Sequence, residues 1–127
     1  MPGEVILVVE DNPLNMELVS DLLDAAGYVV RQAGDAETGI EIARAEQPRL
    51  ILLDVGLPGM DGLEAAGVLR CEPATREIPV VVLTAHAMKG DEEKALAQGC
   101  AGYITKPIDT RSFLKTLENF LHGHRPQ

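Results

Sequence analysis

Short runs of aliphatic residues recur along the chain, and three of them contain no polar interruption. These runs are Val5–Val9, Leu50–Leu53 and Val80–Leu83. Continuous apolar runs of this length are typical of strands that are covered on both faces, as in a parallel sheet. Two weaker segments also favour strands, namely Tyr28–Ala33 and Tyr103–Ile104. Arg31 and Gln32 interrupt the first of these, so we expect it nearer a sheet edge.

Segments with helical periodicity separate the predicted strands. Polar residues suited to a helix start precede them: Asn12, Asp35, Asp61, Asp91 and Asp109. The expected ends of the first four helices are Gly27, Pro48, Arg70 and Gly99. The fifth helix carries its apolar residues on one face up to Leu121, and residues 71–78 and 122–127 are expected to be a loop and a frayed tail.

Strands that alternate with helices predict an α/β unit with a parallel sheet. Because crossover connections are right-handed, few topologies remain. We expect a flavodoxin-like, doubly wound (βα)5 sheet with the strand order 2-1-3-4-5. The first and third strands are neighbours in that order, and ligands of open α/β sheets bind outside the carboxyl ends of the strands at this point.

Polar residues follow the carboxyl ends of four of the predicted strands. They are the pair Glu10-Asp11, then Asp54, Thr84 and Lys106. Taken singly, a strand-end hydroxyl or a surface lysine needs no functional explanation. All five positions fall at strand ends, however, so the fold would bring three carboxylates, a hydroxyl and an ammonium group into one crevice.

Crowded carboxylates repel one another unless a cation lies between them. Oxygen ligands of this kind suit Mg²⁺, which takes one or two carboxylates together with water and phosphate oxygens. The carbonyl of Gly56 is a further candidate ligand, because the loop after Asp54 folds back there. Thr84 and Lys106 suit a phosphoryl group, and Asp54 could then be the nucleophile that forms an acyl phosphate.

Composition limits the other classes of function. The 127 residues fit one domain, 1–127, and the net charge of −9 argues against binding to nucleic acid or to anionic membranes. No apolar run approaches the ~20 residues of a membrane span, and no secretory signal is visible. Cys71 and Cys100 form no metal-binding pattern and are expected to be reduced thiols, which favours a cytoplasmic protein.

The chain resembles the receiver domains of two-component response regulators over roughly Val5 to Leu121. The resemblance rests on Glu10-Asp11, on Asp54 with the following Leu57-Pro58-Gly59-Met60-Asp61-Gly62, on Thr84-Ala85 and on Lys106-Pro107. The opening Glu10-Asp11-Asn12-Pro13-Leu14-Asn15 resembles that of single-domain cell-division and phosphorelay regulators, which have no output domain.

The resemblance implies a role for each matching position. Asp54 would be the phosphoacceptor, and Asp11, Asp54 and the Gly56 carbonyl would bind Mg²⁺, with Glu10 reaching the metal through water. Thr84 and Lys106 would bind the phosphoryl group, and the Lys106-Pro107 peptide bond would be cis. Gly56 departs from the family, which usually has a side chain there. That position and His86 border the path of the attacking water, so both are expected to tune the lifetime of the phosphoryl group.

The resemblance also implies partners and a switch. A histidine kinase or histidine phosphotransferase would donate the phosphoryl group, docking on the first helix and the loop after Pro107. A phosphoryl group on Asp54 would attract Thr84 and Lys106, and movement of Thr84 would let Tyr103 turn inward. The surface of the fourth helix, fifth strand and fifth helix would then present the phosphorylated state to a downstream protein.

Three alternatives remain beside the interpretation as a free-standing receiver. The chain could be a receiver module detached from a hybrid histidine kinase, since such receivers share the opening motif. A Mg²⁺-dependent phosphatase of the haloacid dehalogenase type also uses an Asp nucleophile, but it needs a second Asp where this chain has Gly56. A flavin-binding module would need a phosphate-cradling loop where Glu10 and Asp11 stand. A receiver would catalyse its own phosphorylation and dephosphorylation without being a turnover enzyme.

Overall fold

The computed structural model describes residues 3–57, 59–60, 62–84, 100–105 and 108–121. Its strands are β1 (Val5–Val9), β2 (Val29–Ala33), β3 (Leu50–Asp54), β4 (Val80–Thr84) and β5 (Gly102–Thr105). Its helices in these ranges are α1 (Pro13–Ala25), α2 (Ala36–Glu46), α3 (Gly62–Cys71) and α5 (Phe113–Leu121). The expected helix Asp91–Gly99, the capping residue Asp61 and the expected tail lie outside the described residues.

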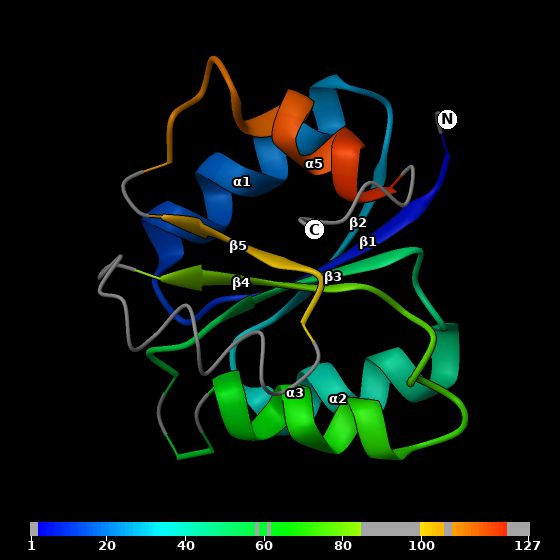
Figure 1. Ribbon diagram of the computed structural model, residues 1–127. Coiled ribbons are helices and arrows are strands. Elements are labelled where there is room, and N and C mark those ends of the chain that lie inside the picture. The colour runs from blue at the N-terminus through cyan, green and yellow to red at the C-terminus, as the bar shows by residue number, and fades with distance from the viewer. Residues whose placement is uncertain (1–2, 58, 61, 85–99, 106–107, 122–127) are drawn as a thin grey trace.

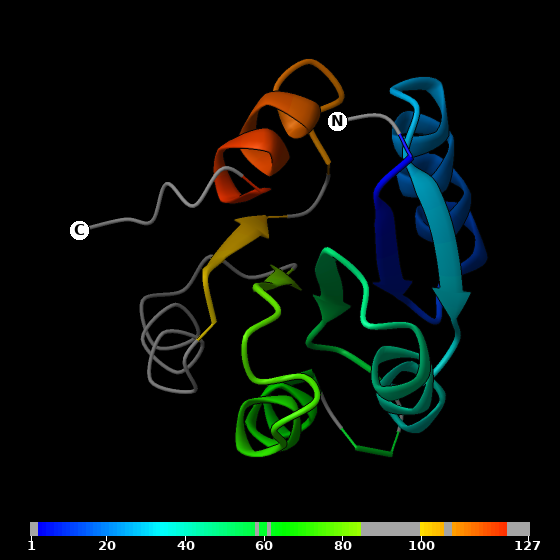
Figure 2. The ribbon, with the colours of Figure 1, turned by 90° about the vertical axis from the view of Figure 1, so that its right-hand side faces the viewer.

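The described strands form one parallel sheet in the order β2-β1-β3-β4-β5 (Figure 1). This order confirms the flavodoxin-like topology. In Figures 1 and 2, α1 and α5 lie on one side of the sheet and α2 and α3 on the other. None of the helices in the described ranges combines the length and apolar character that a membrane span requires.

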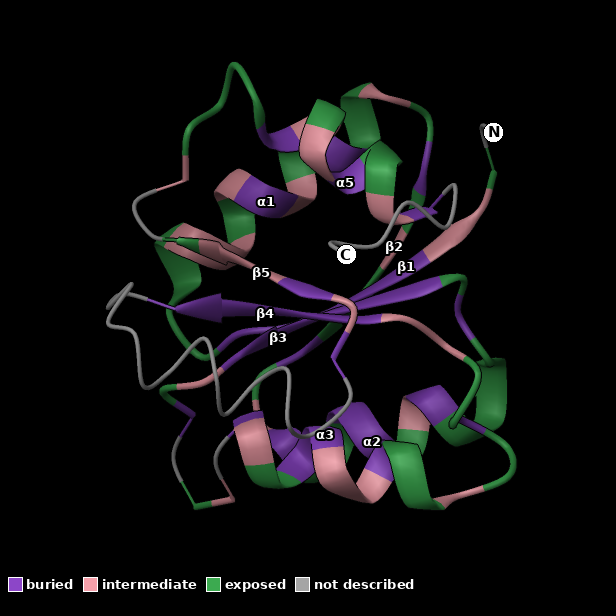
Figure 3. Cartoon of the chain, viewed as in Figure 1, coloured by how far each residue is buried: buried purple, intermediate pink, exposed green. Residues whose placement is uncertain are grey.

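The continuous apolar runs are explained by the two helix layers. Within β1, Ile6 and Val8 pack into the cluster with α1 and α5, whereas Leu7 and Val9 pack into the cluster with α2 and α3. Successive side chains of a strand point to opposite faces, so a strand covered on both sides must be apolar at every position. β3 and β4 are buried along their whole length, as Figure 3 shows.

The strand expected nearer an edge is the edge strand β2. Val29 is 37% exposed. The Arg31 side chain is also exposed, and its Nε donates a hydrogen bond to Glu46 Oε1 of α2 at 2.7 Å. The strand begins at Val29, one residue later than expected, and Tyr28 is buried instead in the α1/α5 cluster.

Local sequence explains how the first two helices begin. The Oδ1 of Asn12 accepts hydrogen bonds from the backbone N–H groups of Leu14 and Asn15, at 2.9 and 3.2 Å. The Oδ1 of Asp35 likewise accepts from the N–H of Thr38 at 2.7 Å, and this hydrogen bond lowers the pKa of the Asp35 carboxyl. Both capping predictions are therefore confirmed, because these side chains satisfy N–H groups that have no partner within the helix.

Two helix boundaries differ from expectation. α2 ends at Glu46, and Gln47 takes a left-handed conformation with φ of 46°, so the chain leaves the helix before Pro48. Asp109 does not stand directly before α5. Its Oδ1 accepts from the N–H of Arg111 at 3.0 Å and its carbonyl from the N–H of Phe113 at 2.9 Å, so Asp109 caps the turn that leads into the helix at Phe113.

Candidate functional site

The carboxyl ends of three neighbouring strands carry the candidate residues. β3 pairs with β1 on one side and with β4 on the other, with Val9 opposite Leu53 and Asp54 opposite Leu83. Glu10 and Asp11 directly follow β1, Asp54 is the last residue of β3, and Thr84 is the last residue of β4. Parallel strands end at the same edge of a sheet, so the topology brings these residues together.

The three carboxylates form one cluster. Glu10, Asp11 and Asp54 each offer a carboxylate oxygen, and these oxygens all lie within 4.8 Å of one another. Glu10 is 2% exposed and Asp54 5% exposed, whereas Asp11 is exposed. The structure thus confirms the predicted convergence of the acidic residues and separates two buried carboxylates from one at the surface.

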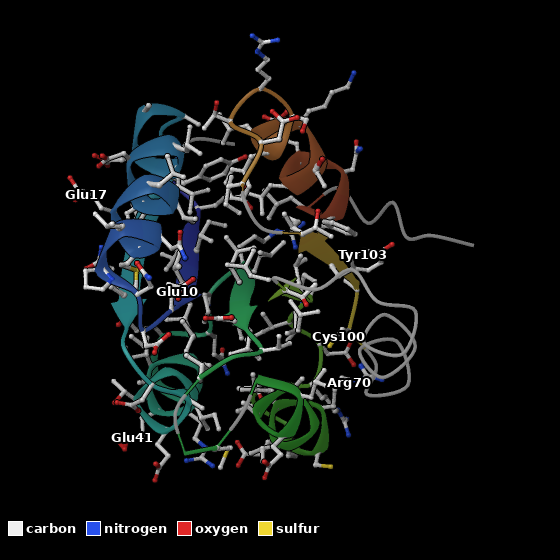
Figure 4. All side chains as sticks on the ribbon, turned by 90° about the vertical axis from the view of Figure 1, so that its left-hand side faces the viewer. Glu10, Glu17, Glu41, Arg70, Cys100 and Tyr103 are labelled. Atoms are coloured by element: carbon white, nitrogen blue, oxygen red, sulfur yellow. The ribbon has the colours of Figure 1, made fainter. Side chains whose placement is uncertain are left out.

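Backbone hydrogen bonds hold Glu10 in its buried position. Its N–H donates to the carbonyl of Ala33 at 3.0 Å, which continues the β1–β2 ladder beyond the strand. Its Oε2 accepts from the N–H of Asn12 at 3.1 Å. Asn12 therefore fixes Glu10 through its backbone and begins α1 through its side chain. Figure 4 looks toward this end of the strands and marks Glu10 beside α1.

Asp54 is positioned by the loop that follows it. The N–H of Gly56 donates to Asp54 Oδ1 at 3.0 Å, and the N–H of Val55 continues the β3–β4 ladder to the carbonyl of Leu83 at 3.1 Å. These contacts hold the Asp54 carboxylate at the end of the sheet. A Cβ added at Gly56 would meet only Asp54 Oδ1, at an ordinary contact distance of 3.7 Å, so this position has room for a side chain next to the carboxylate.

Sequence reasoning missed one residue that shapes the site. A Cβ on Gly62 would come within 2.3 Å of the carbonyl oxygen of Asp54. Only glycine therefore allows the start of α3 to approach the end of β3 this closely. A signal was present in the sequence, because glycine is a poor helix former and yet stands at the first position of the helix.

The set of donors fits a hard divalent cation. Clustered carboxylate oxygens without nitrogen or sulfur ligands are the environment that Mg²⁺ prefers. The cluster opens to solvent on the side of Asp11, so a bound ion could keep water ligands. The remaining candidate ligand, the Gly56 carbonyl, belongs to an exposed residue in the loop after Asp54.

Thr84 and Tyr103 are the candidate switch residues. Thr84 is 3% exposed and pairs in register with Thr105 of β5. Tyr103 lies two residues earlier on β5, opposite Val82, and is half-buried. It lines a cavity of about 220 Å³ together with residues of α5, Phe113 among them. Lys106, Pro107 and His86 lie outside the described residues.

The two cysteines are both free thiols, as expected. Cys71 is exposed at the end of α3, and Cys100 is buried before β5. Burial raises the pKa of the Cys100 thiol to about 11, although the charge of Arg70 acts in the opposite direction. Cys100 is therefore neutral at physiological pH.

Residues 6–118 match the response regulator receiver domain. The chain belongs to this family. It is 43% identical over 121 residues to the polar-differentiation response regulator DivK of Brucella anthropi, covering 95% of this chain and 98% of that protein. This likeness matches the expected resemblance to single-domain cell-division regulators.

Solved structures of receivers have the same fold. A putative response regulator from Chloroflexus aurantiacus superposes with a TM-score of 0.90 at 28% identity, covering 94% of this chain and 98% of that one. A second match is the receiver domain of the sensor histidine kinase PA1611 from Pseudomonas aeruginosa, solved with a magnesium ion coordinated in its active-site cleft. Its TM-score is 0.87 at 32% identity, and the match covers 94% of this chain and 98% of that one. The chain is thus a receiver of two-component signalling.

Proposed function

We propose that this receiver accepts a phosphoryl group on Asp54 in a two-component or phosphorelay pathway. The observation that carries the proposal is the position of Asp54, a buried carboxylate at the end of the central strand, within 4.8 Å of two further carboxylates. An Asp54 oxygen would attack the phosphorus of a phosphohistidine, the P–N bond would break, and the imidazole would leave with the bonding electrons. The product is an acyl phosphate.

The site residues would divide the work around that oxygen. Asp11, Asp54 and the Gly56 carbonyl would bind Mg²⁺, and Glu10, held back in its buried position by Asn12, would act through water. When bound, the ion would neutralise charge on the phosphoryl oxygens. The Thr84 hydroxyl and the Lys106 ammonium would donate hydrogen bonds to the same oxygens. The phosphoryl oxygens carry the negative charge of the transferred group. The Thr84 and Lys106 donors would therefore act at the atoms where that charge is concentrated.

The signal would arise from the change at Thr84. Drawn toward the phosphoryl group, Thr84 would leave the space beside β5 into which the half-buried Tyr103 can turn. The resulting surface, formed by the expected fourth helix with β5 and α5, would bind a downstream protein. This is a shift between two states, so its size depends on how differently the phosphoryl group interacts with each of them.

A histidine kinase or histidine phosphotransferase would supply the phosphoryl group. Leu14, at the start of α1 beside the acidic cluster, is 77% exposed and offers an apolar contact to such a donor. The likeness to DivK, of which the chain covers 98%, favours a free-standing regulator, residues 1–127, over a receiver from a hybrid kinase. We place the protein in the cytoplasm, without binding to nucleic acid and without turnover of an external phosphomonoester.

Labelling with acetyl phosphate and Mg²⁺ tests the phosphoacceptor. Intact-mass analysis should show one added base-labile phosphoryl group in the wild type and none in Asp54→Asn. The matched control is Asp24→Asn, which removes the same charge from an exposed position of α1 and should label as the wild type does. Full labelling of Asp54→Asn would show that another residue is the phosphoacceptor.

The metal ligands are tested by the melting temperature, because an ion that binds only the folded state raises it. Saturating Mg²⁺ should raise the melting temperature of the wild type, and Asp11→Asn should abolish most of this rise. Glu10→Gln should reduce the rise less. An undiminished rise in Asp11→Asn would place the metal elsewhere.

A further inference from the structure

A polar cavity lies at the opposite end of the sheet from Asp54. It has a volume of about 300 Å³ and lies between the end of α3, the loop that precedes β4 and the start of β5. Its exposed lining residues, Arg70, Arg76 and Glu77, are all charged. Its buried or half-buried lining includes Ile78, Cys100 and Ala101. In Figure 4, Arg70 and Cys100 lie near each other and away from Glu10.

Three of the described arginines outside this cavity are ion-paired. Arg31, Arg44 and Arg49 each form a salt bridge, with Glu46, Glu72 and Glu4 respectively. Arg70 and Arg76 form an ion pair with no described residue. The protein has a net charge of −9, and yet this one cavity is lined by two guanidinium groups that have no acidic partner among the described residues.

The cavity is also organised to receive an anion. Arg70 Nη1 donates to the carbonyl of Arg76 at 3.1 Å, which holds the Arg70 guanidinium next to the loop that carries Arg76. The other N–H groups of a guanidinium remain to form the paired hydrogen bonds that carboxylate and phosphate groups accept. The Cys100 thiol is neutral, because burial raises its pKa to about 11, and so it does not repel an anion. Among the described lining residues, Glu77 carries a negative charge, and its carboxylate would repel an anion.

We propose that this cavity, which we call the Arg70/Arg76 cavity, binds a small molecule that carries a phosphate or carboxylate group. Its volume is at the lower end of the range of about 300–1,000 Å³ for ligand sites, which limits the ligand to a small one. The cavity borders the first residues of β4 and β5, whereas Thr84 and Thr105 end the same two strands. The ligand would therefore occupy a site separate from the phosphoacceptor.

Titration followed by amide NMR tests the proposal, with metal-free protein and buffer so that the acidic cluster holds no metal and no chelator competes for the cavity. The two probes are pyrophosphate and succinate, and the probe with the lower Kd identifies phosphate or carboxylate as the preferred group. We expect saturable shifts at the amides of Ile78, Cys100 and Ala101. Arg76→Gln should weaken binding about tenfold, the size expected for loss of a charged hydrogen bond, and Glu77→Gln should strengthen it.

The matched control is Arg111→Gln. Arg111 is exposed between β5 and α5, at the other end of β5, so this variant removes the same charge outside the cavity and should change the Kd less than twofold. Shifts that stay linear with both probes, or equal losses in Arg76→Gln and Arg111→Gln, would overturn the proposal and indicate only general attraction of anions. Because the titration uses neither Mg²⁺ nor phosphorylation, its outcome is independent of the role of Asp54.

Discussion

Replacing Gly62 with alanine should destabilise the protein through a clash with the backbone beside the acidic cluster. The added Cβ would lie 2.3 Å from the carbonyl oxygen of Asp54 and 2.8 Å from its carbonyl carbon. Both atoms belong to the backbone of the central strand, so neither can move away as a flexible side chain could. Overpacking of this kind costs typically about 1–3 kcal/mol, and we expect the upper end because the clash is with backbone.

The expected change in melting temperature follows from the size of the domain. Alanine also restricts the unfolded chain, which favours folding by about 0.4–1 kcal/mol and leaves a net loss of roughly 2 kcal/mol. At about 2.1 cal/mol/K per residue, the unfolding entropy is roughly 0.27 kcal/mol/K for a chain of this length, so the melting temperature should fall by about 7 °C. Thermal unfolding followed by circular dichroism in EDTA measures this difference directly.

Gly34→Ala is the matched control. A Cβ at Gly34 would meet nothing within 4 Å, and the residue has no positive φ, so the control should melt at or slightly above the temperature of the wild type. Since the clash displaces either α3 or the end of β3, Gly62→Ala should also weaken the stabilisation by Mg²⁺. If the two variants melted at the same temperature, the close approach of α3 to Asp54 would not constrain position 62.

Three further predictions concern the switch, the lifetime of the phosphoryl group and the buried thiol. The Thr84→Ala variant should still be phosphorylated. The amide shifts that beryllofluoride, a phosphoryl mimic, causes around Tyr103 should be smaller in this variant, and shifts as large as those of the wild type would refute coupling through Thr84. Gly56→Leu should slow hydrolysis of the phosphorylated protein several-fold, because the side chain would border Asp54 and exclude water; an unchanged half-life after removal of the donor would contradict this. The raised pKa of Cys100, about 11 against 9.0, means that the contribution of this thiol to stability is complete below about pH 9 and declines as the pH rises toward 11. Cys100→Ala should flatten the fall in the urea midpoint over that range, and an equally steep fall would rule out this contribution.

The strand order and the position of the acidic cluster could be predicted because both follow from short-range patterns and a few rules of topology. Uninterrupted apolar runs such as Leu50–Leu53 require cover on both faces, and right-handed crossovers then bring β1 beside β3. A residue that ends one of these strands must lie at the shared edge of the sheet. The clustering of Asp54 with Glu10 thus depends on topology alone, and no detail of side-chain packing enters.

Features that depend on contacts between distant segments could not be predicted in the same way. Nothing in the sequence tells which of the adjacent residues Glu10 and Asp11 is buried, since that depends on the carbonyl of Ala33 and the N–H of Asn12. The left-handed conformation of Gln47 is equally hidden, because glutamine has no special preference for it.

The burial of the two acidic residues bears on how the site can work. A carboxylate is costly to bury unless hydrogen bonds or a cation compensate it. The N–H of Asn12 donates a hydrogen bond to the Glu10 carboxylate, and the N–H of Gly56 donates one to the Asp54 carboxylate. Both donors belong to loops that are anchored by a neighbouring helix or strand. These loops therefore hold the two carboxylates in place before any ion or phosphoryl group arrives, and they leave the exposed Asp11 as the one member of the cluster free to adjust to a ligand. If Asp54 is the phosphoacceptor as proposed, such a site would need little reorganisation on phosphorylation, and the phosphoryl group would act mainly on Thr84, at the end of the neighbouring strand.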